Sequence, residues 1–489
     1  MDMPMIQNMP TVAELMPLLP ELVLVGAAFA LLMLDLFLSE KQRVATHVLA
    51  VASLVVVALM IIMNVGGQGT VLSGMFIRDG MADVLKIGAC LVSAMALVYA
   101  WPFLRERGLY KGEVPVLVMF AVSGMMLLIS AGSLVMVYLG LEMLALCSYA
   151  LVAIDRDSPL ASEAAMKYFV LGALASGMLL YGMSLVYGAT GSIDLATISA
   201  SAGSVAHPTM LLAGVAFMVA GIAFKFGAAP FHMWLPDVYQ GAPTPITLFI
   251  GSAPKLAAFA MAIRLLDFGA GALGDHWQPM LAGLAALSLI IGNLIALVQT
   301  NLKRMLAYST VSHVGFLFMG MAGGGADGNA AAMFYALSYA IMAAAAFGAI
   351  VVLSRRLPSG SLVEADRIDD FKGLNARDPW SAGLVLCVMA SLAGVPPFLG
   401  FWAKLVVLRA ALQGNLLWLA IIGIVSAVIG AFYYLRVIKV MYFDEPSGEP
   451  LQPRDDFPVQ VVFGVNALFL LVFGLFWNPL MAWCQQAFA

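Results

Sequence analysis

The chain has 489 residues, of which 62% are hydrophobic and 11% are charged, and its formal net charge is −4. Soluble domains carry roughly 25% charged residues, so this composition excludes a soluble multi-domain protein. A small charge spread over short connections also excludes a basic surface for nucleic acid. The four cysteines stand apart in apolar runs, without the spacing of a metal site or a redox motif.

Long apolar runs predict a polytopic membrane protein. Runs of about 20 apolar residues span a bilayer as helices, and these runs lack the alternating pattern of a membrane barrel. We therefore expect an all-α bundle of about 14 transmembrane helices. The first six are predicted at residues 18–38, 44–65, 82–100, 115–130, 134–154 and 164–187, and the others begin near Met210, Pro245, Met280, Met305, Ala331, Gly383, Leu416 and Val459.

The basic residues indicate the direction of the spans, because Lys and Arg concentrate in cytoplasmic connections. One set of alternate connections has little beyond Arg78. We expect both termini on the non-cytoplasmic side, with no cleaved signal peptide because the N-terminus lacks a basic start. The cytoplasmic set contains Lys41, Arg43, Arg105, Arg107, Lys111, Arg156, Lys303, Arg304, Arg355, Arg356, Arg367, Lys372, Arg377 and Arg454. Its longest member, residues 354–380, is interpreted as a solvated loop with an amphipathic turn.

Two stretches repeat at an offset of 167 residues: GAAPFHMW at 227–234 and GVPPFLGFW at 394–402. AMKY at 165–168 and AMFY at 332–335 share that offset, which indicates internal duplication. Five predicted spans separate the copies, so the second copy crosses the membrane in the opposite sense. Such inverted repeats are typical of transporters.

The repeats predict four parts of the chain. Helices 1–3 occupy residues 1–114, the first five-helix repeat 115–267, the second repeat 278–443, and helix 14 residues 457–489. Each repeated stretch contains glycine and proline in the middle of a span, which removes helical hydrogen bonds. We therefore expect broken helices 7 and 12, surrounded by a wet, protein-lined interior. A packing kink is the alternative.

Four charged residues lie inside the predicted spans: Glu142 in helix 5, Lys225 in helix 7, Lys255 in helix 8 and Lys404 in helix 12. Each such charge costs roughly 2.5–3.5 kcal/mol on insertion scales, so they should face the interior. Burial and a neighbouring opposite charge act against each other on protonation, which suits a proton carrier. Lysines are poor metal ligands, and one glutamate supplies too few oxygens for sodium. A purely structural role for the four charges is the alternative.

His232 and His313 are candidate bridges between the lysines, because a neutral imidazole both donates and accepts hydrogen bonds. Tyr308 and the hydroxyl groups that follow it up to Ser312 are candidates for ordering a water chain with them. Each histidine is equally well explained as a packed core residue. Lys167 lies toward a helix end, where snorkelling is the ordinary explanation, but it belongs to the same half as Glu142.

Five segments together resemble the antiporter-like proton-translocating subunits of bacterial NADH-quinone oxidoreductase, respiratory complex I. They are LEMLALCSYALVA, GIAFKFGAAPFHMWLPDVYQGAPTPIT, SAPKLAAFA, NLKRMLAYSTVSHVGF and SLAGVPPFLGFWAKL. The resemblance covers helices 4–13. Within this family Lys255 and Lys404 are similar to the N subunits, whereas M subunits have a glutamate at the second position. The chain also lacks the extra helix of L subunits.

The resemblance implies roles for the buried charges. Glu142 and Lys225 would form the pair that modulates the first half-channel, Lys255 the central relay, and Lys404 the proton-exchange group of the second half-channel. The chain would bind no cofactor itself, since NADH, FMN, iron-sulfur clusters and quinone belong to other subunits of the complex. It would be a non-redox subunit of a proton-translocating enzyme in the bacterial inner membrane, between subunits K and M, with both termini periplasmic.

Two other functions are compatible with the sequence. A stand-alone or Mrp-type cation/proton antiporter shares the fold and the helix 7 signature, and Lys255 and Lys404 separate it from the first interpretation only weakly. A structural scaffold, whose charges hold subunits together, is the second alternative. Substitution of Lys225 or Lys255 by alanine would leave proton pumping intact in a scaffold.

Overall fold

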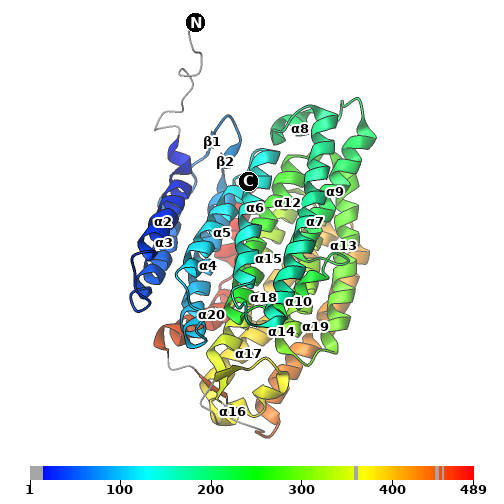
Figure 1. Ribbon diagram of the computed structural model, residues 1–489. Coiled ribbons are helices and arrows are strands. Elements are labelled where there is room, and N and C mark those ends of the chain that lie inside the picture. The colour runs from blue at the N-terminus through cyan, green and yellow to red at the C-terminus, as the bar shows by residue number, and fades with distance from the viewer. Residues whose placement is uncertain (1–14, 357–361, 447–450, 454–455) are drawn as a thin grey trace.

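The computed structural model describes residues 15–356, 362–446, 451–453 and 456–489. Their helices form a bundle and run roughly along one axis (Figure 1). The predictions for the N-terminus before Leu15 and for Arg454 lie outside the described residues.

The N-terminal helices form a layer at one side of the bundle, drawn in blue in Figure 1. Glu21, Leu24, Ala28 and Leu31 of the first long helix are buried at helical spacing, which defines the stripe that faces the bundle. Glu21 forms an ion pair of 2.5 Å with Lys86. The elements of this layer are η1 (Met16–Leu18), α2 (Leu19–Asp35), α3 (Val44–Ile62), the antiparallel pair β1 (Gly69–Val71) and β2 (Phe76–Arg78), and α4 (Gly80–Glu106).

The next part of the chain contains two interrupted helices. Its elements are α5 (Glu113–Ile129), α6 (Leu134–Val152), α7 (Pro159–Thr190), α8 (Leu195–Ser201), α9 (Pro208–Phe226), α10 (Trp234–Gly241), α11 (Thr244–Gly251), α12 (Ala253–Ala262), the π-helix η2 (Ile263–Phe268) and η3 (Gly271–Leu273).

The remaining elements contain the second interrupted region. They are α13 (Gly274–Leu297), α14 (Leu302–Ala322), α15 (Gly325–Val352), β3 (Leu353–Arg356), β4 (Leu362–Glu364), η4 (Ile368–Phe371), α16 (Leu374–Arg377), α17 (Pro379–Ala393), α18 (Leu399–Gln413), α19 (Leu417–Phe443), β5 (Leu451–Pro453), α20 (Phe457–Leu475) and α21 (Asn478–Gln486).

The described residues include 12 helices that are long and apolar enough to cross a membrane, and α5 and α17 are shorter apolar helices. Together they are consistent with the expected total of about 14. The prediction of an all-α membrane bundle is confirmed. The division into two five-helix repeats stays a prediction.

The predicted interruptions of helices 7 and 12 are present. α9 ends at Phe226 and α10 begins at Trp234, while α17 ends at Ala393 and α18 begins at Leu399. Gly227 and Gly394 follow these helix ends with φ values of 75° and 84°, a conformation that glycine adopts without steric cost. Helix 8 is also interrupted, at Ser252 between α11 and α12, and the sequence analysis did not predict this.

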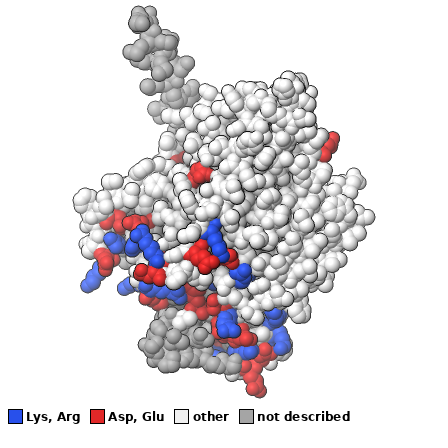
Figure 2. Space-filling model, turned by 45° about the vertical axis from the view of Figure 1, so that its right-hand side comes forward, with Lys and Arg blue, Asp and Glu red and all other residues white. Residues whose placement is uncertain are grey.

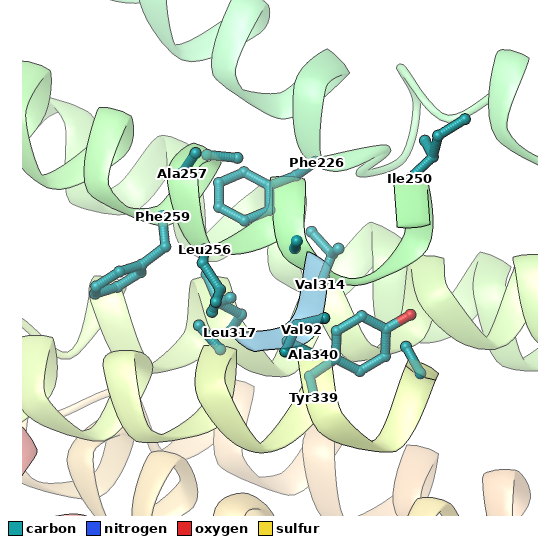
Figure 3. Packing of buried hydrophobic residues seen from close by; sticks show 14 of the residues in the cluster. Val92, Phe226, Ile250, Leu256, Ala257, Phe259, Val314, Leu317, Tyr339 and Ala340 are labelled. Carbon is teal, nitrogen blue, oxygen red and sulfur yellow. The ribbon is translucent and has the colours of Figure 1, made fainter. Parts of the chain in front are cut away.

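The core lies where the middle of the chain crosses the bundle. The span from Thr244 to Phe268, α14 and α15 are each 94% buried over their most apolar window. Figure 3 shows Phe226 of α9, Leu256 of α12, Val314 of α14 and Tyr339 of α15 packed together there. The interrupted helices therefore adjoin the most enclosed part of the protein.

The long connection is more ordered than the predicted solvated loop. β3 pairs antiparallel with β4 and with β5, so that Ser354 lies opposite Glu364 on one side and Gln452 on the other. Glu364 is not solvated: its side chain is only 13% exposed. It accepts a hydrogen bond from Thr244 and pairs with Lys303 and Arg107, so the connection is fastened to the helices.

Charged residues gather at one end of the bundle. Figure 2 shows blue and red side chains at the lower end and an almost entirely white surface above them. We call this region the charged end; its residues include Lys303, Arg304, Glu364, Lys372 and Arg377. The predicted asymmetry of Lys and Arg is therefore visible as one polar cap on an apolar body.

Candidate functional site

Lys255 contacts the interrupted end of α9. Its Nζ donates a hydrogen bond of 2.7 Å to the carbonyl oxygen of Phe226, the last residue of that helix. Only 3% of Lys255 is exposed. The last carbonyls of a helix lack intrahelical donors and carry partial negative charge, so they stabilise an ammonium group. The interruption at Ser252 places Lys255 in the first turn of α12, beside this helix end.

Lys404 makes the corresponding contact at the second interruption. Its Nζ donates hydrogen bonds of 3.0 Å and 2.9 Å to the carbonyl oxygens of Leu392 and Ala393, the last two residues of α17. A Cβ atom added to Gly394 would lie 3.1 Å from this Nζ. Glycine at this position therefore serves both the turn of the backbone and the close approach of the ammonium group.

Lys225 lies beside a small cavity in the first half of the bundle. The cavity measures about 30 Å³, and its polar wall consists of Lys225, Ser148 and Tyr168. A water molecule needs roughly 10–15 Å³ of such space, so the cavity has room for water. Its other walls are apolar side chains from α5, α6 and α12, and water there would have the ammonium group as a partner.

Glu142 lies close enough to Lys225 to interact electrostatically. Among the described residues, Glu142 forms no ion pair within 4.0 Å, and its Oε1 is buried without a hydrogen-bond partner. The two groups are therefore a separated pair on α6 and α9 rather than a closed salt bridge. Such an arrangement leaves both charges open to water or to a neighbouring chain.

His313 is the centre of a hydrogen-bonded cluster in the second half. Its Nδ1 shares a hydrogen bond of 2.7 Å with the Tyr335 hydroxyl, and its Nε2 shares one of 3.1 Å with the Tyr434 hydroxyl. Tyr434 also bonds to Ser309. Lys404 acts electrostatically on His313, so this cluster is the polar surrounding of the second lysine.

Further hydroxyl groups extend the cluster along α14. Tyr339 donates to Thr310 at 2.7 Å. Asn293 donates to Ser312 at 2.8 Å and accepts from Tyr433 at 3.0 Å. The hydroxyl residues expected to order a water chain thus bond to protein groups from α13, α15 and α19.

His232 and Tyr308 lie together, away from His313. Their ring centres are 6.2 Å apart, and Arg304 lies over the Tyr308 ring at 5.8 Å. His232 is 8% exposed, and its Nδ1 has no hydrogen-bond partner within the part of the chain that the structure describes. Tyr308 and His313 therefore belong to different clusters, although one short segment contains both.

Lys167 does not snorkel into solvent but bridges two carboxylates. Its Nζ lies 2.7 Å from Glu163 and 2.7 Å from Asp237. Asp237 also pairs with Arg304 at 2.8 Å. This network joins α7, α10 and α14 at the charged end, and the sequence analysis did not single out Asp237.

The sequence analysis also missed Tyr335, Tyr339 and Tyr434. Two signals were available: Tyr335 and Tyr339 are four residues apart, so they share a helix face, and Tyr434 follows another tyrosine inside an apolar span. Buried tyrosines need a partner for the hydroxyl group, which makes such positions informative.

The described residues contain no group of three or more His, Cys, Asp or Glu side chains that could hold a metal ion. The chemistry available at the site is therefore that of lysine, histidine, tyrosine and carboxylate side chains, all of which exchange protons.

Comparisons with known proteins identify the family. Residues 131–430 match the model of the family described as NADH:quinone oxidoreductase/Mrp antiporter, TM. The NADH-quinone oxidoreductase subunit N of Xanthomonas euvesicatoria pv. vesicatoria (strain 85-10) is 66% identical over 98% of this chain and 97% of the relative. The subunit N of Thioalkalivibrio sulfidiphilus (strain HL-EbGR7) is 49% identical over 96% of this chain and 98% of the relative.

Solved structures share the fold. A chain of respiratory complex I from Thermus thermophilus with bound aureothin has a TM-score of 0.80 and 30% identity, covering 95% of this chain and 98% of that one. A chain of the Mrp complex from Dietzia sp. DQ12-45-1b has a TM-score of 0.82 at 21% identity, covering 98% and 97%, and shows the fold alone. With the sequence matches over nearly its whole length, the chain belongs to the family of NADH-quinone oxidoreductase N subunits.

Proposed function

We propose that this chain translocates protons across the membrane, as a non-redox membrane subunit of an NADH-quinone oxidoreductase. One observation carries the proposal: Lys255 and Lys404 are buried, and each donates to the carbonyl end of an interrupted helix. The same arrangement occurs twice, at stretches that repeat in the sequence.

The energies are on a suitable scale for a proton carrier. A lysine at mid-membrane costs roughly 2.5–3.5 kcal/mol, and the helix-end carbonyls offset part of that cost. Moving one charge against 100 mV takes about 2.3 kcal/mol. A modest change in water or charge near Lys255 or Lys404 is therefore enough to change which form of the lysine is favoured.

The proposed route has two halves. In the first, Glu142 and Lys225 modulate proton uptake at the cavity, and Lys255 is the central relay. In the second, His313 with Tyr335 and Tyr434 receives the proton, and Lys404 exchanges it. His232, Tyr308 and Lys167 support the route at the charged end.

The proposed topology places the charged end in the cytoplasm, following the excess of Lys and Arg there. The C-terminal residue Ala487 packs on Gly80 at the start of α4, at the end of the bundle where Asp79 and Arg78 lie. This contact supports a periplasmic C-terminus in the bacterial inner membrane, and the periplasmic N-terminus remains part of the proposal.

The partners are other membrane subunits of the complex, with subunits K and M as the proposed neighbours. NADH, FMN, iron-sulfur clusters and quinone are bound by other subunits, and quinone reduction there supplies the driving free energy. The role of this chain is the movement of protons alone.

An Mrp-type or stand-alone cation/proton antiporter is the less supported alternative. The Mrp chain is 21% identical to this one, whereas curated N subunits reach 66%. The fold does not separate the two functions, so the proposal depends on the sequence matches and on the lysine at position 404.

The test uses the assembled complex in proteoliposomes. Lys255→Ala and Lys404→Ala should abolish most proton pumping during NADH oxidation, measured with a pH-sensitive dye, while the subunits still assemble. Lys439→Ala is the matched control, because Lys439 is 65% exposed and pairs with Asp444 outside the route. Intact pumping in both variants would refute the proposal and support a scaffold.

A further inference from the structure

One carboxylate at the charged end is held by cations from both predicted repeats. Lys167 of α7 donates to Oδ2 of Asp237 at 2.7 Å, and Arg304 of α14 donates to its Oδ1 at 2.8 Å. Asp237 itself lies on α10. Each oxygen of this side chain therefore joins α10 to a different half of the molecule.

α10 is a short segment whose position matters for the lysine relay. It has eight residues and lies between the interruption after α9 and the connection to α11. Its first residue, Trp234, has its ring 5.8 Å from Nζ of Lys255, and His232 directly precedes the helix. A shift of α10 would change the surroundings of Lys255.

The first turn of α14 holds this segment at further points. Arg304 also donates to Gln240 at 3.1 Å. Lys303 donates to the carbonyl oxygen of Ala242 at 2.8 Å. Two consecutive basic residues of α14 thus bind successive positions around the end of α10, and Asp237 is the only carboxylate among these acceptors within the described residues.

Stability does not explain the Asp237 bridge. The side chains of Lys167, Asp237 and Arg304 are 41%, 32% and 31% exposed. Ion pairs with this much exposure contribute little to stability and are screened by salt. Nor does Asp237 suit proton carriage, because a carboxylate between two cations stays ionised at neutral pH.

We propose that Asp237 is a positioning residue that couples the two halves of the protein. By joining Lys167 to Arg304 it keeps α10, and with it Trp234 above Lys255, in register with α14. α14 carries His313, so the bridge links the surroundings of the first lysine to the polar cluster of the second. This inference rests on the proposed proton translocation.

The test compares three variants in the complete complex in proteoliposomes. The readout is the number of protons translocated per NADH oxidised. Asp237→Asn should lower this ratio by about twofold or more, the scale at which residues of a coupled network act. Asp237→Glu should restore it. Glu163→Gln is the matched control, because Glu163 shares Lys167 but is 61% exposed and lies outside the Arg304 contact.

The outcomes separate coupling from simple support. If Asp237→Asn lowers the amount of complex and leaves the ratio unchanged, the residue is structural and the proposal is overturned. An equal effect of Glu163→Gln would also overturn it. If Asp237→Asn does not assemble, Arg304→Gln provides the same measurement, and failure of both to assemble counts against coupling. Intact pumping in Lys255→Ala would instead refute the proposed function, whatever Asp237→Asn shows.

Discussion

The two interruptions share a backbone design but differ in the side chains around them. Both follow a helix whose last carbonyls accept from a buried lysine, and both turn at a glycine. The first has a cavity with Lys225 and the separated Glu142 nearby. The second has His313 and neutral tyrosines. The backbone has been kept in two copies, whereas the proton-exchanging groups have not.

The repeat offset makes this difference specific. At 167 residues, Lys225 corresponds to Leu392, and Lys404 corresponds to Asp237. The position that provides the second buried lysine provides, in the first half, the carboxylate bridge of the charged end. One copy of the fold thus places a mobile proton where the other places a fixed ion pair.

Removing the tie between the halves is the coarsest way to break this comparison. Glu364→Gln should cost about 3 kcal/mol or more, the penalty for breaking a buried pair, because Lys303 and Thr244 lose their shared acceptor. Thermal unfolding of the purified complex would measure it. Gln at Asp369 is the control, since Asp369 is 67% exposed, and equal losses would contradict the prediction.

The same residue predicts an acid dependence. Burial acts to raise the pKa of Glu364, but Lys303, Arg107 and Thr244 outweigh it and hold the pKa below the ordinary 4.5. Its contribution to stability is therefore complete above about pH 4.5 and is lost as the pH falls through the lower folded value. Glu364→Gln should flatten this part of the stability profile.

Glycine substitutions test whether the two turns are equivalent. Alanine at either position faces a positive φ, which costs roughly 1–2 kcal/mol. A Cβ at Gly227 would lie 2.3 Å from Leu235, whereas one at Gly394 would approach Lys404. Gly227→Ala should mainly lower the yield of folded complex, and Gly394→Ala should mainly lower pumping per assembled complex. Identical effects on both measurements would show that the difference is unimportant.

The tyrosines of the second half allow a finer test. Tyr335→Phe removes the 2.7 Å bond to His313 and should cost about 0.5–1.5 kcal/mol and slow proton pumping. Tyr433→Phe removes a bond to Asn293 in the same region and should cost as much stability without slowing pumping. Equal pumping rates in the two variants would exclude a relay through Tyr335.

The smallest effect is expected in the first half. The hydroxyl group of Tyr149 is buried and has no hydrogen-bond partner among the residues that the structure describes. Removing an unpartnered buried group is neutral or slightly stabilising, so Tyr149→Phe should change the unfolding free energy by about 0–1 kcal/mol. A clear loss of stability would show that this tyrosine is bonded as firmly as Tyr335.

The sequence was sufficient for the features that depend on residue type alone. Glycine and proline within apolar spans predicted the interruptions after Phe226 and Ala393, because these residues disrupt helical hydrogen bonding wherever they lie. Lys255 and Lys404 were predicted to face the interior because a charge has no other low-energy place in a membrane.

The remaining features depend on which helices meet. No local pattern shows that Lys255 donates to Phe226, 29 residues away, or that Tyr434 reaches His313, 121 residues away. Glu364 was misjudged because its neighbours in sequence are polar, whereas its partners Thr244 and Lys303 come from other parts of the chain. Asp237 was missed for the same reason.

The origin of the donor at each interruption has a mechanical consequence. Lys255 belongs to α12 but holds the end of α9, so loss of its proton loosens two separate rods from one another. Lys404 and its acceptors belong to the two arms of one bent rod, so the same event there relaxes an elbow. A single hydrogen ion thus produces sliding at one site and flexing at the other.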